Sequence, residues 1–199
     1  MRNKILLLSA YDASSHKLWR RRLLQLFPQL NWTQLALPPR HFNWRIRGNS
    51  LQWATTELKT LNQPYDLLIV TSMVDLSSLR GFVPALSKIP TLIYFHENQF
   101  AYPAGEQHRE NVEHQLVPLY SALCADVVVF NSQFNRQTFL EGARSLIQRL
   151  PEKFPDSILD KLQNSQVIPV PIDTRELKQD PKKDKHDDSI LEVIWNHHL

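Results

Sequence analysis

Short apolar runs alternate with amphipathic stretches along most of this 199-residue chain. The apolar runs are brief, continuous and rich in Leu, Ile and Val, which is the pattern of strands that are buried on both faces. They predict six strands, at residues 4–10, 32–37, 66–70, 91–95, 126–130 and 166–169. Between the strands, apolar residues recur at helical spacing and predict helices at 15–27, 50–61, 75–86, 106–123, 133–150 and 156–162. Pro84 can interrupt the third of these helices.

Strands that alternate with helices favour a parallel sheet with helices on both faces. The predicted fold class is therefore α/β, with a doubly wound, mostly parallel Rossmann-like sheet. The first expectation for the strand order is 3-2-1-4-5-6, with the switch point between strands 1 and 4. Ligands bind beyond the carboxyl ends of the strands near such a point, so the turns at 11–16 and 96–99 form the candidate site.

The composition divides the chain into three parts. Residues 1–173 hold the whole alternating pattern and are predicted as one N-terminal domain, large enough to bury its own core. Residues 174–189 are predicted as a charged linker, because 178–188 contain no aliphatic side chain. Residues 190–199 begin with the strand-like run ILEVIWN, and we expect them to be the first strand of a C-terminal domain that this sequence does not include.

The overall composition fits a folded soluble domain, with 42% hydrophobic and 22% charged residues. The single cysteine, Cys124, excludes a disulfide framework and fits a reducing compartment. No apolar run approaches the roughly 18 residues of a membrane span. The apolar stretch at 5–8 is also too short for a secretory signal. We therefore expect a cytoplasmic protein without a membrane partner.

Several common motifs for cofactors are absent from the sequence. The four glycines stand too far apart to form GxGxxG or GxxxxGK[ST], which excludes the usual dinucleotide fingerprint and the P-loop. A zinc helix of the HExxH type is excluded because Phe100 stands where the second histidine would be. The chain also contains no DxD and no GxSxG. We expect neither a metal nor another cofactor.

His96, Glu97, Asn98 and Gln99 follow the fourth predicted strand directly. Four polar side chains at the carboxyl end of a buried strand, near the predicted switch point, suit a ligand site. The alternative is a polar transition from strand to loop whose groups are hydrogen-bonded within the protein. The position of these residues favours the ligand site.

Two further turns follow predicted strands. Ser15 and His16 open the first helix, where backbone N–H groups and the helix dipole favour an anion such as phosphate. A simple N-cap by Ser14 or Ser15 explains the same residues equally well. Asn131 and Ser132 take the matching place after the fifth strand, and there an N-cap is the favoured interpretation.

Residues 38–48 (PPRHFNWRIRG) show no clean period and are predicted as a long aromatic and basic loop. Arginines bind phosphates, and aromatic rings stack on unpaired bases. The net charge of +3 is too small to indicate nucleic-acid binding, so this local clustering is the basis of that hypothesis. A surface loop whose tryptophan packs on the domain remains the alternative. The candidate contacts are Arg40, Trp44, Arg45 and Arg47, with Arg20 and Arg21 of the first helix.

Several segments together resemble those of the tRNA-queuosine alpha-mannosyltransferases, which are glycosyltransferases of the two-domain GT-B class. The most specific segments are FHENQ, PPR-x-x-x-WR-x-R and FNS-x-FN, in combination. The likeness covers residues 1–173 and 190–199.

The resemblance implies that this domain faces the acceptor, while a C-terminal domain binds the donor GDP-mannose. The implied acceptor is queuosine in the anticodon of aspartate tRNA, and mannose is transferred with retention and without an obligatory metal. His96 matches a histidine that reaches the transferring sugar in related retaining enzymes, so it is the candidate catalytic residue. Ala13 and Ser14 stand where many family members carry glycines, which argues against a tight phosphate loop at this turn. The polar turn residues become candidate cleft residues, and the basic set becomes candidate contacts to the anticodon arm.

Three function classes follow from these observations. The first is the acceptor half of a mannosyltransferase, and this chain alone is then expected to be inactive. The second is a non-catalytic module that binds tRNA or another partner. The third is an unrelated nucleotide-binding domain, and the missing glycine fingerprint argues against it.

Overall fold

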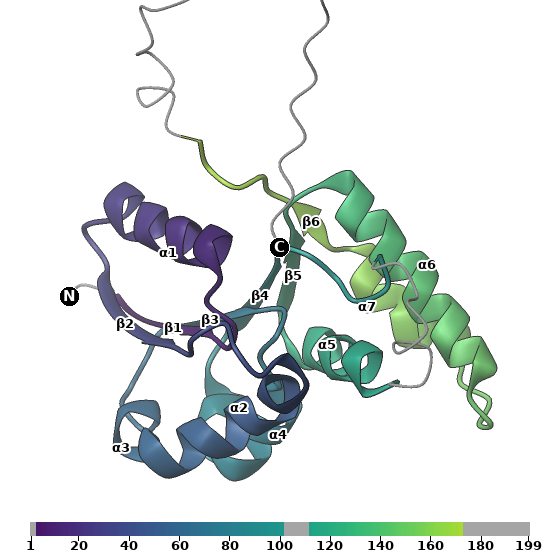
Figure 1. Cartoon of the computed structure of the whole chain (residues 1–199), viewed down its shortest axis with the longest axis horizontal. Coiled ribbons are helices and arrows are strands. Elements are labelled where there is room, and N and C mark those ends of the chain that lie inside the picture. Colours follow the sequence, from purple (N-terminus) through teal and green to yellow (C-terminus); the bar gives the residue numbers. More distant parts are fainter. Residues whose placement is uncertain (1–2, 102–111, 173–199) are drawn as a thin grey trace, which may run out of the picture.

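The computed structural model describes residues 3–101 and 112–172, which form a sheet flanked by helices (Figure 1). All strands of the sheet run parallel, in the order β2-β1-β3-β4-β5-β6. This arrangement confirms the predicted α/β class with a Rossmann-like sheet. The strands are β1 (Lys4–Ser9), β2 (Asn31–Ala36), β3 (Leu67–Thr71), β4 (Thr91–Phe95), β5 (Val127–Phe130) and β6 (Gln166–Val167).

The expected strand order of 3-2-1-4-5-6 is wrong, because β3 lies beside β1 and β2 forms the edge. The composition of the two strands gives the physical reason. β2 carries Thr33 and Gln34 in its middle and has no buried residue, whereas four of the five residues of β3 are buried. An inner strand is covered on both faces, so the apolar β3 takes the inner place. The switch point therefore lies between β1 and β3, not between strands 1 and 4.

Helix α1 covers one face of the sheet, and the longer helices that follow pack against the other face (Figure 1). The helices are α1 (Ser14–Leu26), α2 (Phe42–Thr56), α3 (Leu58–Leu61), α4 (Leu76–Phe82), α5 (Glu113–Cys124), α6 (Gln133–Arg149) and α7 (Asp160–Gln163), with 3-10 turns at Pro84–Lys88 and Asp156–Leu159. The break between α4 and the turn at Pro84 confirms the predicted interruption. Part of the helix predicted at 106–123 lies outside the described residues.

Alternate residues of the strands enter two separate cores. Leu6 and Leu8 of β1 belong to the larger core under helices α2 to α7, whereas Ile5 and Leu7 belong to a smaller core under α1. Successive side chains of a strand point to opposite faces, so each buried strand supplies both cores. Trp19 is the residue of α1 that is fully inserted in the smaller core.

Two local predictions are wrong. The segment predicted as a loop over 38–48 becomes helical at Phe42, after His41 in the left-handed region with φ 57°. Buried Ile46, Asn49 and Trp53 share one face of this helix. Aromatic and basic residues stand between them in the sequence, so their helical spacing is not apparent from the sequence alone. Neither Ser14 nor Ser15 caps α1, because Ala13 occupies the N-cap position without a side-chain hydrogen bond.

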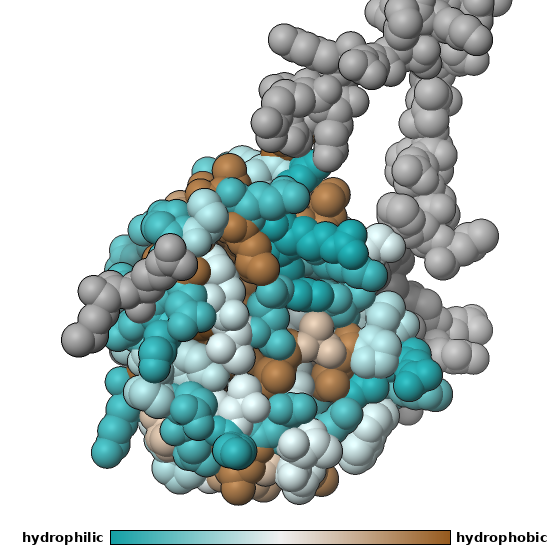
Figure 2. All heavy atoms as spheres, turned by 90° about the vertical axis from the view of Figure 1, so that its left-hand side faces the viewer, coloured by the Kyte–Doolittle hydropathy of each residue, from teal (hydrophilic) through white to brown (hydrophobic). Residues whose placement is uncertain are grey.

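Beyond β6 the chain returns across the face that carries α1. The hydroxyl of Tyr94 donates to the carbonyl of Ile168 at 2.7 Å, and Arg22 donates to the carbonyl of Pro171. Figure 2 shows the side of the molecule that faces left in Figure 1, where small apolar groups are separated by polar residues. The predicted linker at 174–189 and strand at 190–199 lie outside the described residues.

Candidate functional site

His96 is the first residue beyond β4, and it is enclosed by aromatic rings. Its ring centroid lies 4.0 Å from that of His16 and 4.8 Å from the rings of both Trp19 and Tyr94. Trp19 also stacks on Tyr94 at 4.5 Å. Ring packing from α1 and β4 therefore fixes the orientation of the His96 imidazole.

The His96 imidazole is buried, with 8% exposure, and neither ring nitrogen has a hydrogen-bond partner among the described residues. Loss of water around the ring, and secondarily the nearby His16, lower the pKa of His96 to about 2. The ring is therefore neutral at physiological pH and offers one N–H donor and one acceptor nitrogen. Most buried polar groups are paired, so an unpaired imidazole at the end of a strand marks a place for a ligand or water.

His16 joins the start of α1 to the turn after β4. Its Nε2 lies 3.3 Å from Oε2 of Glu97, and an ionised carboxylate only accepts, so the imidazole is the donor. The two turns predicted as the site thus meet in space, although the strand order expected for them is wrong. They meet because α1 packs on β4, where Trp19 stacks on Tyr94. His16 at the start of the same helix packs against His96.

Asn98 fixes the turn after β4 onto α6. Its side-chain amide donates to Oδ1 of Asn135 at 2.6 Å, and its oxygen accepts the backbone N–H groups of Phe100 and Ala101 at 2.9 and 3.1 Å. Asn131 completes the network by donating to the carbonyl of His96 at 2.6 Å. These amides hold the backbone that carries His96.

Ser132 is the N-cap of α6, as predicted, because its Oγ accepts the N–H of Asn135 at 3.2 Å. It also borders a cavity of about 270 Å³ at the carboxyl edge of the sheet. The cavity is lined in part by His96, Glu97, Asn131, Ser132 and exposed Phe134.

Three predicted cleft residues, Ser15, His16 and Gln99, are not among the residues that line this cavity, and His16 instead contacts Glu97. Ser15 is exposed on the first turn of α1, and the amide nitrogen of Gln99 lies 4.0 Å from the sulfur of Met73. Sequence reasoning missed Trp19, Tyr94 and Asn135. Tyr94 stands two positions before His96 in the chain, so the period of a strand already places it on the same face.

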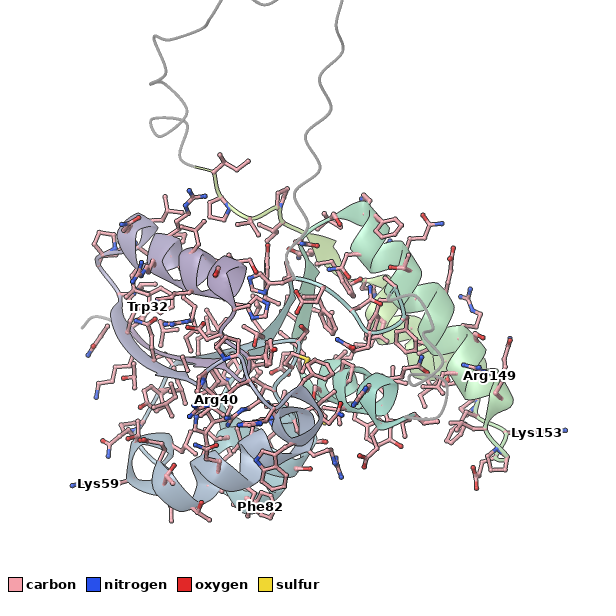
Figure 3. The ribbon with its side chains drawn as sticks, in the orientation of Figure 1. Trp32, Arg40, Lys59, Phe82, Arg149 and Lys153 are labelled. Atoms are coloured by element: carbon pink, nitrogen blue, oxygen red, sulfur yellow. The ribbon has the colours of Figure 1, made fainter. Side chains whose placement is uncertain are left out.

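A larger cavity of about 670 Å³ lies at the other end of α6, in the region of Lys153 (Figure 3). Its lining mixes Arg144 and Glu152 with apolar Ile147 and Phe154. His96, whose ring nitrogens have no hydrogen-bond partner among the described residues, is one of the residues that line the smaller cavity, so we take the smaller cavity as the candidate site.

The predicted basic contacts do not share one surface. Arg45 is buried and donates to Gln52 at 2.6 Å, and burial lowers its pKa. Its position inside the fold contradicts the interpretation of Arg45 as an exposed phosphate contact. Arg20 is held by Asp12 at 2.6 and 2.9 Å and also donates to Gln34. Arg21, Arg40, Arg47 and Trp44 are exposed.

Two further findings concern the residues that the structure describes. No three His, Cys, Asp or Glu side chains among them are grouped so that they could hold a metal ion. None of their helices has the length and apolarity needed to cross a membrane.

Comparison with known proteins gives consistent results. A sequence profile described as tRNA-queuosine alpha-mannosyltransferase N-terminal matches residues 4–172. The chain is 26% identical over 200 residues to the tRNA-queuosine alpha-mannosyltransferase of Drosophila melanogaster. This alignment covers 97% of the chain and 52% of the relative, so the chain spans about half the length of the curated relative it matches. No solved structure matches the sequence.

Proposed function

Because the chain belongs to the tRNA-queuosine alpha-mannosyltransferase N-terminal family, we propose that it forms the acceptor side of an enzyme that mannosylates queuosine in tRNA. The donor in this proposal is GDP-mannose, which the other half of a longer protein would hold. The transfer proceeds with retention and without a metal.

One observation of this structure supports the proposal most strongly: the neutral, unpartnered imidazole of His96 at the edge of the cavity. A sugar hydroxyl is both a donor and an acceptor, which matches the one N–H and one free nitrogen of a neutral imidazole. A phosphate only accepts and is better matched by a cation. We therefore assign His96 to a hydroxyl of the transferring sugar, where a fixed polar contact stabilises the transition state.

The surrounding residues have distinct roles in this proposal. Glu97, which His16 of α1 contacts at 3.3 Å, lines the cavity together with Asn131 and with Ser132 at the start of α6. Asn98 acts through the backbone, because its side chain is used within the protein.

The acceptor role is tested by measuring binding of this chain to aspartate tRNA with and without queuosine. We expect measurable affinity and tighter binding of the queuosine-containing tRNA. Equal affinity for both tRNAs, with no transfer by any longer form, would favour the non-catalytic tRNA-binding module.

The role of His96 is tested by mannosyl transfer in a longer protein that joins this chain to a donor-binding half. His96→Ala should lower turnover on the order of 10²-fold. Gln137→Ala, an exposed change on α6, is the matched control and should leave turnover unchanged. Near-normal turnover of His96→Ala would contradict the assignment.

The 199 residues alone are expected to bind GDP-mannose negligibly and not to transfer mannose. Near-attack geometry contributes roughly 7–11 kcal/mol and requires both substrates to be held together. Calorimetry that showed tight GDP-mannose binding by this chain would place the donor site in this half.

A further inference from the structure

The Trp44 indole packs against Gly48 of its own helix. A Cβ atom added at Gly48 would stand 2.6 and 2.8 Å from Cζ2 and Cδ2 of the indole, closer than real contacts allow. The glycine therefore lets the ring rest on α2, four residues further along the same helix face. Trp44 is 57% exposed, so the ring keeps an accessible surface.

A second exposed aromatic ring borders the same hollow. Phe82 ends α4, is 52% exposed, and lies on the outer side of α2 and α4, away from the sheet (Figure 3). A cavity of about 210 Å³ is lined by Trp44, Gly48, Leu51 and Phe82, together with Arg47 and Ser78. Two large exposed aromatic rings in the lining of one hollow require an explanation, because burying them would be favourable.

Among the described residues, the lining of this hollow contains one cation, Arg47, and one anion, Asp75. The Nη1 of Arg47 lies 3.0 Å from Oδ2 of Asp75, and its Nε lies 3.7 Å from Oε1 of Glu113. The side chain is still 47% exposed, and no residue of the described chain pairs with its Nη2. The carboxylates thus hold the guanidinium in place, and its remaining N–H groups can reach a phosphate oxygen.

We propose that Trp44, Phe82 and Arg47 form a clamp for one unpaired nucleotide of RNA, with the base against the aromatic rings and the phosphate on the guanidinium. This inference rests on the tRNA-binding part of the proposed function, and it places one contact outside the cavity at His96. Aromatic rings bind bases through their π faces and arginine binds the backbone, which is the usual division in single-strand recognition. Exposed Arg40, just before α2, is a further cation near the start of this helix.

The clamp is tested by fluorescence anisotropy with two labelled RNAs, the anticodon stem-loop of aspartate tRNA and an unstructured oligouridine. Stacking on an aromatic side chain is worth about 1–3 kcal/mol per base by alanine substitution, which is about 5- to 150-fold in affinity. We expect Trp44→Ala and Phe82→Ala each to weaken binding of both RNAs within this range. Phe154→Ala, which removes another exposed ring far from the hollow, is the control and should change nothing.

Gly48→Ala tests whether the position of the Trp44 indole matters, because the variant keeps the indole but moves it. The added methyl group displaces the Trp44 ring, while every side chain of the clamp is kept. Alanine is the better helix former by about 1 kcal/mol, so the helix itself should tolerate the change, which urea unfolding can verify. We expect the change in log Kd for RNA caused by Gly48→Ala to be at least half of the change caused by Trp44→Ala.

The outcomes distinguish the clamp from the proposed function. Tight stem-loop binding that none of the three variants weakens would overturn the clamp and leave the proposed function standing. Equal, Trp44-dependent binding of both RNAs, with no preference for queuosine tRNA, would support the clamp and count against the proposed function. No binding of either RNA by the wild-type chain would overturn both, and the hollow would then fit a protein partner.

Discussion

Acidification should destabilise this protein through His96. The imidazole is neutral in the folded chain, with a pKa of about 2, whereas its ordinary value is 6.5. The unfolded chain therefore binds a proton below about pH 6.5 that the folded chain does not bind. The free energy of unfolding is therefore unaffected by the titration of His96 above pH 6.5, and it decreases as the pH falls from 6.5 toward the folded pKa of about 2.

The magnitude follows from linkage. Below about pH 6.5, where the histidine of the unfolded chain is protonated, the free energy of unfolding falls by about 1.4 kcal/mol per pH unit. Between about pH 7.5 and pH 5.0 the loss from His96 alone is about 2 kcal/mol. That is a substantial part of the 5–15 kcal/mol by which domains are ordinarily stable.

The assay is urea unfolding of the wild-type chain and of His96→Gln at both pH values. Carboxylates and the other histidines titrate in both proteins, so the difference in unfolding free energy between them reports on His96 together with its contact to His16. We expect the wild-type chain to lose about 2 kcal/mol more than the variant on acidification, with unchanged m-values. The same loss in both proteins would refute the burial of a neutral imidazole.

Three further predictions concern Asn98 in the turn after β4, Ser132 at the start of α6, and Arg47 of the proposed RNA clamp. Asn98→Ala should lower the unfolding free energy by roughly 1–3 kcal/mol in urea, because two backbone N–H groups lose their acceptor; an unchanged midpoint would contradict this role. Ser132→Ala should cost about 1 kcal/mol as the loss of an N-cap, whereas exposed Ser145→Ala on the same helix should cost far less. Arg47→Ala should reduce the log–log salt dependence of tRNA affinity by about 0.7–0.9, and an unchanged slope would show that this arginine touches no phosphate.

The class of fold, and the edge of the sheet at which the candidate site lies, follow from the local pattern of residues along the chain. Continuous apolar runs separated by helical periods can be buried only in a parallel sheet covered on both faces, so the strands were predictable within a few residues. The polar turn that starts at His96 follows one of these runs directly, which placed it at the carboxyl edge. The N-cap at Ser132 and the break at Pro84 were also predictable, because each depends only on a few neighbouring residues.

Which strands are neighbours, and which side chains meet, depends on packing across the whole fold. Strand order depends on the relative cost of burying β2 or β3 in the interior, and this cost is a property of the whole sheet. The contact between His16 and His96 joins residues 80 positions apart through the path of α1, and no local pattern encodes that distance. Arg45 shows the same limit. Its charge favours an exposed position, but it lies on the buried face of α2 and is therefore buried with that face.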